Sequence, residues 1–460
     1  MLTWVEKSIQ QREAVLCGAS RKIWELAEVK YHEQHSAQVL KDLLQKEGFR
    51  VVEQAASELP TSFIAAYGAG APVIGLLAEY DALPGLRQDA SPVESSHNGN
   101  GHGCGHNLLG VGAVGAALAV KDFLDREGCP GTVKLFGCPA EESGGSGKVY
   151  MARAGCFDGL DAALSWHPND FNAAALPRTL ANFQARFSFH GRTAHAGMAP
   201  EQGRSALDAC ELMNVGVNYL REHVIQGARI HYAYLNAGLP VANVVPDFAM
   251  THYNVRAPKM SQAKEIFARI VDIAKGAALM TGTTMEYHVC GGMYDYVPNG
   301  PLSKAMHEAF CQVGAPAFDE ADMDLARRFR VTEPEEKQQA LAKRGPVLDT
   351  AVPAQLNLNL TMGGSTDVGD VSYIVPTAQA AIACAAVGTG AHTWQFAAQA
   401  GGSIGEKGML TAAKVLALTA IKAMQDPALL RAAKEEFLDQ IGGSYVCPLP
   451  DGVVPERGEA

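Results

Sequence analysis

Five side chains of the kinds that bind divalent transition-metal ions lie far apart along the chain. They are Cys104, His106, Glu142, His167 and His392. One thiol, one carboxylate and three imidazoles can form the ligand shell of one or two such ions. Glu141, next to Glu142, is the right kind of group to take a proton from a metal-bound water. Together these residues predict a metal-dependent hydrolase.

Each candidate also has an ordinary structural interpretation. Cys104 and His106 stand among glycines, where the cysteine could be no more than a buried thiol in a tight turn. A Glu-Glu pair is more often a solvated acidic turn, and an isolated histidine such as His167 is more often a core residue. Two nearby histidines, His97 and His102, are interpreted as polar loop residues. The combination of candidates, rather than any one of them, favours a metal site.

A Gly-rich run from Ser143 to Lys148 is similar in composition to a phosphate-binding loop. Val149 stands where that loop has the Ser or Thr that binds magnesium. We therefore do not expect a nucleotide site there.

The segments that must position these residues alternate between strands and helices. Short apolar runs at 73–78, 132–136 and 162–165 are typical of buried strands, and 105–126 is predicted to be a buried helix. This order predicts an α/β fold with a mostly parallel sheet. Several candidates follow the end of a predicted strand, where sheets of this kind place their sites.

The pattern changes after residue 181. Strands are predicted at 183–189, 229–235, 248–256 and 284–289, with helices at 205–222 and 261–280. A β-α-β-β-α-β order is typical of a ferredoxin-like domain. The predicted organisation is a first part of a catalytic domain at 1–181, an inserted domain at 182–294, and the second part at 295–460. A charged, proline-bearing segment at about 316–355 is predicted to be a surface insertion.

Composition narrows the function classes. The 460 residues are 47% hydrophobic and 19% charged, which is ordinary for a globular protein of two or three domains. A net charge of −11 argues against a nucleic-acid partner. The longest uninterrupted apolar runs are too short to span a membrane. Ten cysteines without a CxxC spacing, and no apolar leader, predict a reducing cytoplasm.

Five motifs together resemble those of peptidase family M20, and more closely its subfamily D, the amidohydrolase branch. The motifs are Ala78-Glu79-Tyr80-Asp81-Ala82-Leu83-Pro84, Gly103-Cys104-Gly105-His106-Asn107, Pro139-Ala140-Glu141-Glu142, Gly191-Arg192-Thr193-Ala194-His195-Ala196 and Gly390-Ala391-His392-Thr393. The segment from His97 to Leu109 and the long insertion before Gly363-Gly364-Ser365-Thr366-Asp367 support the narrower match. The resemblance extends over nearly the whole chain.

The resemblance implies a phosphorylase/hydrolase-like catalytic domain holding two divalent metal ions, Mn²⁺ or Zn²⁺. Their ligands would be Cys104, His106, Glu142, His167 and His392, with Glu141 as the general base. The inserted ferredoxin-like domain would serve as a lid and for dimerisation. Its His195 would polarise the scissile carbonyl in the partner's site, assisted by Asn243. Arg256 would bind a carboxylate of the substrate, since a guanidinium can do so with two parallel hydrogen bonds.

The sequence departs from most of the family at one position. Glu79 stands where most members have a metal-binding histidine, although the amidohydrolase branch also lacks that histidine. Asp81 is retained and is expected to orient a ligand histidine. How five ligands divide between two ions therefore stays open.

The function implied is hydrolysis of the amide bond of an N-acyl or N-aroyl amino acid, with p-aminobenzoyl-glutamate as the expected substrate. A dipeptidase or aminoacylase with the same ligands and a different pocket is the alternative within the enzymes. The other alternative is a weakly active or non-catalytic partner subunit. The expected assembly is a homodimer, or a hetero-oligomer with a related subunit, and no nucleic acid or membrane partner is expected.

Overall fold

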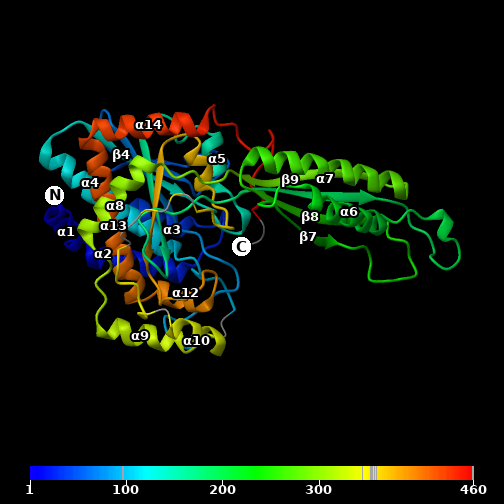
Figure 1. Cartoon of the computed structure of the whole chain (residues 1–460), viewed down its shortest axis with the longest axis horizontal. Helices are drawn as coiled ribbons and strands as arrows, with labels where there is room; N and C mark the ends of the chain where they lie inside the picture. The colour runs from blue at the N-terminus through cyan, green and yellow to red at the C-terminus, as the bar shows by residue number, and fades with distance from the viewer. Residues whose placement is uncertain (96–97, 344, 353–355, 357, 359, 458–460) are drawn as a thin grey trace.

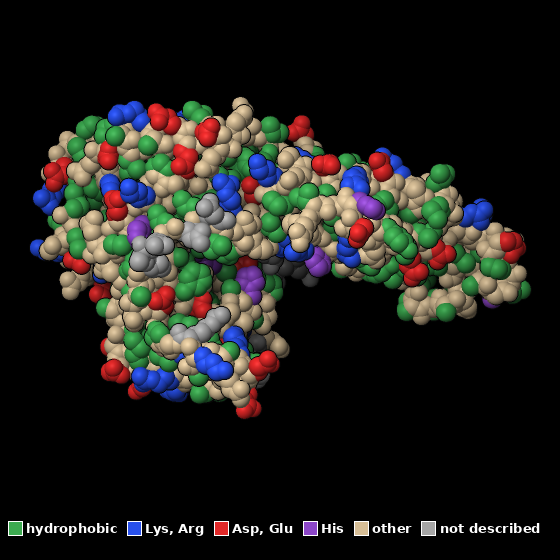
Figure 2. Space-filling view, viewed as in Figure 1, with side chains coloured by type: hydrophobic (Ala, Val, Ile, Leu, Met, Phe, Trp, Pro, Cys, Tyr) green, Lys and Arg blue, Asp and Glu red, His purple; other side chains and the backbone are tan. Residues whose placement is uncertain are grey.

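The computed structural model describes residues 1–95, 98–343, 345–352, 356, 358 and 360–457. An α/β body holds one sheet, and an elongated arm built on a second sheet projects from it (Figure 1). On the face shown in Figure 2, charged side chains of both signs are interspersed over body and arm. The body contains the candidate metal ligands, so we call it the catalytic domain, and we call the arm the lid.

The catalytic domain is built on a six-stranded sheet. Its strands are β1 (Arg50–Glu53), β2 (Phe63–Ala69), β3 (Val73–Glu79), β4 (Gly131–Cys138), β5 (Ala162–Asn169) and β10 (Thr377–Ala383). Their order is β1-β2-β4-β3-β5-β10. β3 pairs in parallel with β4 and β5, and β5 with β10, whereas β2 is antiparallel to β1 and β4. The carboxyl ends of β3, β4 and β5 therefore meet at one edge.

Helices cover this sheet. They are α1 (Leu2–Gln10), α2 (Glu13–Leu26), α3 (Gln34–Lys46), α4 (His106–Glu127), α5 (Gly147–Arg153), α8 (Gly300–Val313), α11 (Val368–Ser372), α12 (Trp394–Ala400), α13 (Ser403–Gln425) and α14 (Pro427–Ile441). The central helix α4 packs against β3, β4, β5 and α13. A Cβ atom on Gly112 would lie 2.8 Å from the ring of buried Trp166, so glycine is what allows α4 to approach β5 this closely.

Within the described residues, α4 is the one helix long and apolar enough to cross a membrane. However, 89% of its most apolar window is buried inside the protein. The uninterrupted-run criterion applied to the sequence missed it, because glycines and alanines dilute the pattern. Burial of this extent is typical of a core helix.

The lid comprises strands β6 (Ala181–His190), β7 (Arg229–Asn236), β8 (Phe248–Ala257) and β9 (Thr284–Met293), with helices α6 (Ala206–Leu220) and α7 (Met260–Thr281). The strands are antiparallel in the order β7-β8-β6-β9, which is the ferredoxin-like arrangement. Alternate residues of β6 face the helices: Phe183 and Phe187 pack on Phe267 of α7, with ring centroids 4.8 and 5.9 Å apart. Edge strand β7 is largely exposed.

The predicted fold class is confirmed: a mostly parallel α/β sheet accompanies a separate antiparallel four-stranded domain. Three details differ from the sequence prediction. The N-terminal helical region is three helices, β1 and β2 were not predicted, and β5 extends to Asn169, so that His167 lies within it. In the charged segment, the described residues form α9 (Glu320–Arg330) and α10 (Glu335–Ala342) below the catalytic domain in Figure 1.

Candidate metal centre

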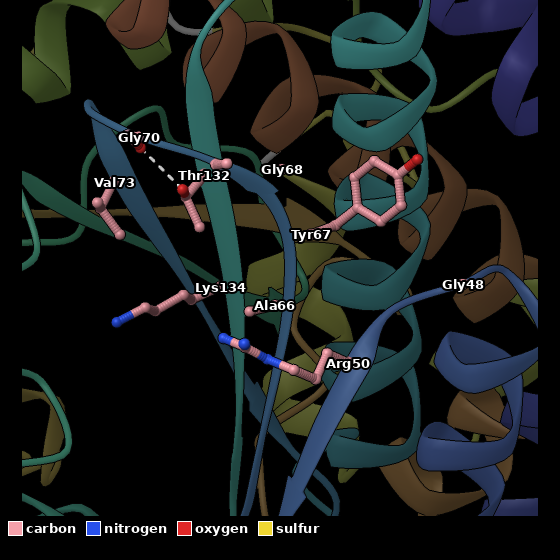
Figure 3. Close-up of a pocket in the computed structure, with 10 residues that line it drawn as sticks. Gly48, Arg50, Ala66, Tyr67, Gly68, Gly70, Val73, Thr132 and Lys134 are labelled. Carbon is pink, nitrogen blue, oxygen red and sulfur yellow. Dashed lines mark hydrogen bonds between the residues drawn. The ribbon is translucent and has the colours of Figure 1, made fainter.

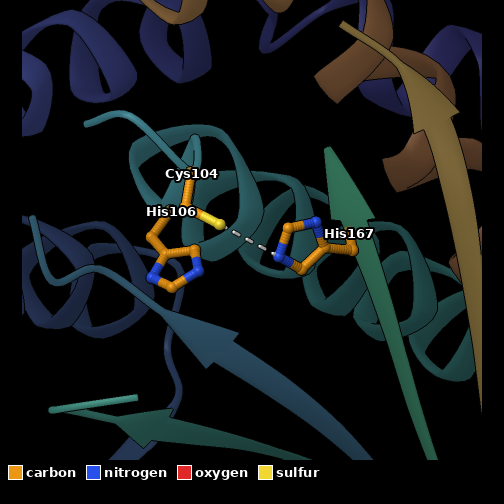
Figure 4. A group of neighbouring side chains, drawn as sticks. All are labelled: Cys104, His106 and His167. Atoms are coloured by element: carbon orange, nitrogen blue, oxygen red, sulfur yellow. Dashed lines mark hydrogen bonds between the residues drawn. The ribbon is translucent and has the colours of Figure 1, made fainter. Parts of the chain in front are cut away.

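The five predicted ligands come together at the carboxyl edge of β3, β4 and β5. His106 begins α4, and Cys104 lies in the turn before it. Glu142 follows β4, His167 lies near the end of β5, and His392 precedes α12. Figure 4 shows Cys104, His106 and His167 pointing toward one another from these elements.

Distances between the donor atoms are short enough for shared ions. Ligand atoms lie within 4.8 Å of one another in three groups. The groups are Cys104, His106 and His167; Cys104, Glu142 and His392; and Glu79, His106 and Glu141. Cys104 Sγ lies 3.5 Å from His167 Nε2, and His392 Nε2 lies 3.3 Å from Glu142 Oε1. The third group adds Glu79, which the sequence singled out only as a departure from the family pattern.

Neighbouring groups hold the ligands in place. Asp81 is buried and receives two hydrogen bonds, one at 2.8 Å from Nδ1 of His106 and one at 2.8 Å from the backbone N–H of Glu142. Nδ1 of His167 donates to the carbonyl oxygen of Pro168 at 2.7 Å. In both histidines Nδ1 is therefore engaged, which leaves Nε2 facing the other donors.

The residues present fit a divalent transition ion. Nε2 of His106 and Oε1 of Glu142 are buried without a hydrogen-bond partner. A buried polar atom left unpaired is costly. Both atoms belong to groups whose donors converge, and the thiol, imidazole and carboxylate types suit Zn²⁺ or Mn²⁺.

Glu141 lies beside these donors and remains partly exposed. Enclosure by the protein, together with the carboxylates of Glu79 and Glu142, raises the pKa of Glu141 well above its usual range. A carboxyl group with a raised pKa is a stronger base when ionised, as proton transfer near neutral pH requires.

Lys148, at the end of the Gly-rich run, is fully buried and has a role that the sequence did not indicate. Its Nζ atom lies 2.6 Å from Oε1 of Glu79 and 2.5 Å from Oδ1 of Asp367. Its backbone N–H donates to Oδ2 of Asp367 at 2.8 Å. The run therefore closes around an internal ion-pair network, which agrees with the prediction that it does not bind nucleotide.

The three predicted substrate-contacting residues lie on the lid. His195 forms an isolated bridge with Val244, next to Asn243, whose carbonyl oxygen accepts from Ala196 N–H. Arg256, on β8, donates to the carbonyl of Gly363 at 3.2 Å. None of the three is among the grouped metal-site donors of the described chain. His97 lies outside the described residues, and His102 is buried with Nε2 bonded to Ile23 O.

A surface cavity of about 620 Å³ lies elsewhere, over β1, β2 and β4. Figure 3 shows Arg50 and Lys134 beside it. No candidate metal ligand lines it, so its size has no bearing on the candidate chemistry.

Comparison with known proteins gives the family. The model of peptidase family M20/M25/M40 matches residues 75–422. The chain belongs to peptidase family M20. The resemblance in its motifs is thus confirmed, and the M20 chain is a metallohydrolase of the peptidase class.

Two curated relatives are similar over most of their length. One is a component polypeptide of the p-aminobenzoyl-glutamate hydrolase of Escherichia coli, which is 43% identical, covering 98% of each chain. The other is human Xaa-Arg dipeptidase, which is 31% identical, covering 92% of this chain and 88% of the relative.

Solved structures share the M20 fold. A dinuclear metal binding peptidase of family M20 from Bacillus subtilis superposes with a TM-score of 0.62 at 18% identity, covering 90% of this chain and 99% of that one. An aminobenzoyl-glutamate utilization protein from Klebsiella pneumoniae gives a TM-score of 0.61 at 17% identity, covering 91% and 98%.

Proposed function

We propose that this M20 protein hydrolyses the amide bond of N-acyl or N-aroyl amino acids, with p-aminobenzoyl-glutamate as its substrate. The observation that carries the proposal is the convergence of the buried donors with Glu141 beside them. The 43% identity to the p-aminobenzoyl-glutamate hydrolase polypeptide supports the substrate.

We infer two divalent ions, Mn²⁺ or Zn²⁺, held by Cys104, His106, Glu142, His167 and His392. Such ions, when bound, polarise the carbonyl group and lower the pKa of water to about 7. Glu141 takes the proton from the attacking water and later delivers it to the leaving amine. Asp81 keeps His106 in the tautomer with Nε2 free and fixes the backbone of Glu142.

On the lid, we assign substrate contacts to His195, Asn243 and Arg256. An imidazole and an amide directed at the carbonyl oxygen would stabilise the negative charge that develops on it. Arg256 would bind the carboxylate of the amino-acid portion. We propose that His195 acts in the site of a partner subunit, as the resemblance to the family implies.

The subunit composition follows from the same comparison. The relative at 43% identity is named as a subunit, so an oligomer is supported. We propose either a homodimer or a complex with a related subunit, and a reducing cytoplasm as the compartment, since all ten cysteines are free.

A dipeptidase is the second candidate, because the human relative at 31% identity is an Xaa-Arg dipeptidase. It would use the same donors, so the site alone does not separate the two activities. The test is a substrate panel for the purified protein loaded with Mn²⁺ or Zn²⁺: p-aminobenzoyl-glutamate, N-acetyl-glutamate and dipeptides ending in arginine. Preference in kcat/KM for the aroyl glutamate supports the proposal, and preference for the dipeptides would replace it.

A further inference from the structure

Glu33, just before α3, is bonded to the turn that carries Glu141, although 107 residues separate it from Ala140. Its carboxylate is fully buried. Oε1 accepts from the backbone N–H of Ala140 at 2.8 Å and of Tyr31 at 2.9 Å. Oε2 accepts from Oγ1 of Thr61 at 3.0 Å. Three donors thus converge on one buried carboxylate.

The turn needs such support, because Ala140 has φ of +57°, in the left-handed region that residues with a side chain rarely adopt. Its carbonyl oxygen accepts from Gly147 N–H at 3.1 Å. A Cβ atom on Gly147 would lie 1.8 Å from the carbonyl oxygen of Pro139, so only glycine permits this closure. Both faces of the strained residue are therefore held, one of them by Glu33.

Two further bonds fix the rest of the turn. The hydroxyl of Tyr31 donates to the carbonyl oxygen of Gly145. The N–H of Glu142 donates to Asp81. Among the described contacts, Glu33 supplies the anchor nearest in sequence to Glu141, while Asp81 supplies that of the adjacent metal ligand.

We propose that Glu33 is a positioning residue, which holds the Ala140 peptide so that the carboxylate of Glu141 faces the candidate metal centre. This inference rests on the proposed function, because it assumes that Glu141 is the base. Reach, not charge, is what the geometry requires. Burial, with Asp81 nearby, raises the pKa of Glu33 to about 8, which agrees with a neutral side chain being tolerated there.

The test compares three substitutions in the full-length protein. Glu33→Gln keeps the length and an oxygen for the two N–H groups, and the Thr61 hydroxyl can rotate to accept. Glu33→Asp keeps the charge but is one methylene too short, and Glu33→Ala removes the group. Asp322→Ala is the matched control, since Asp322 is also buried and accepts hydrogen bonds from Ser403 and Lys407, in the surface segment. Metal content, thermal stability, kcat and KM are measured for each on p-aminobenzoyl-glutamate.

We expect Glu33→Gln to retain kcat, while Glu33→Asp and Glu33→Ala lose about 10- to 100-fold in kcat with KM and metal content unchanged. Asp322→Ala should lose stability without losing kcat. If Glu33→Ala does not fold, Glu33→Asp carries the comparison. Wild-type kcat in a folded Glu33→Asp protein, or a loss that follows loss of metal, would overturn the inference. An inactive wild-type protein would instead count against the proposed function.

Discussion

The Nζ atom of Lys148 lies 2.6 Å from Oε1 of Glu79, and the two side chains are at most 3% exposed. This ion pair lies directly behind the candidate metal centre, because the other oxygen of Glu79 is 3.3 Å from Nε2 of His106. A buried lysine thus compensates a carboxylate at the position where most of the family has a histidine.

Removal of the ammonium should therefore destabilise the protein strongly. Lys148→Met would leave Glu79 and Asp367 buried without their counter-ion, which costs about 3 to 5 kcal/mol in free energy of unfolding. The matched control is Lys275→Met, because Lys275 pairs with Asp272 at the surface, with exposed fractions of 63% and 75%. Chemical denaturation should show no measurable change for the control. Equal stability of the two variants would contradict the buried pair's role.

Asp370 should make stability depend on pH. Burial raises its pKa to about 8, although Tyr294 N–H and the Tyr445 hydroxyl donate to it. Because the folded-state pKa lies above the unfolded one, its stabilising effect is fully present below about pH 4 and is lost as pH rises through 8. Relative to Asp370→Asn, the wild type should lose free energy of unfolding across this range. A difference that stays constant with pH would contradict the assignment.

Cys104 should determine which metal is preferred. A thiolate is a soft ligand that favours Zn²⁺, whereas Mn²⁺ prefers oxygen. We expect Cys104→Ser to weaken Zn²⁺ binding more than Mn²⁺ binding, as measured by calorimetric titration of each ion. Cys311→Ser is the control, because Cys311 is exposed on α8. Equal weakening of both ions in Cys104→Ser would remove Cys104 from the ligand set.

The parts of the fold that could be predicted are those with strong local patterns. Apolar runs identified β3 and β4, and alternation identified the lid strands. β1 was missed because it has four mostly exposed residues, so its pairing with β2, rather than its sequence, makes it a strand.

For the site, residue types were enough to nominate ligands but not their supports. Lys148 and Asp367 are 219 residues apart, and Glu33 is 107 residues from Ala140. Contacts of this kind depend on tertiary structure, and a buried lysine looks the same in sequence as a surface one. The Gly-rich run before Lys148 was the only local signal, since close backbone approach requires glycine.

The central claim is that Glu141 acts as the base in metal-assisted amide hydrolysis. It is tested most directly by comparing Glu141→Gln with wild type in single-turnover cleavage of p-aminobenzoyl-glutamate, with metal content measured in the same samples. Glu335→Gln, on α10, is the control for the loss of a carboxylate. We predict that Glu141→Gln binds metal and substrate but loses at least about 100-fold in rate. A metal-loaded Glu141→Gln protein that cleaves at the wild-type rate would contradict the claim.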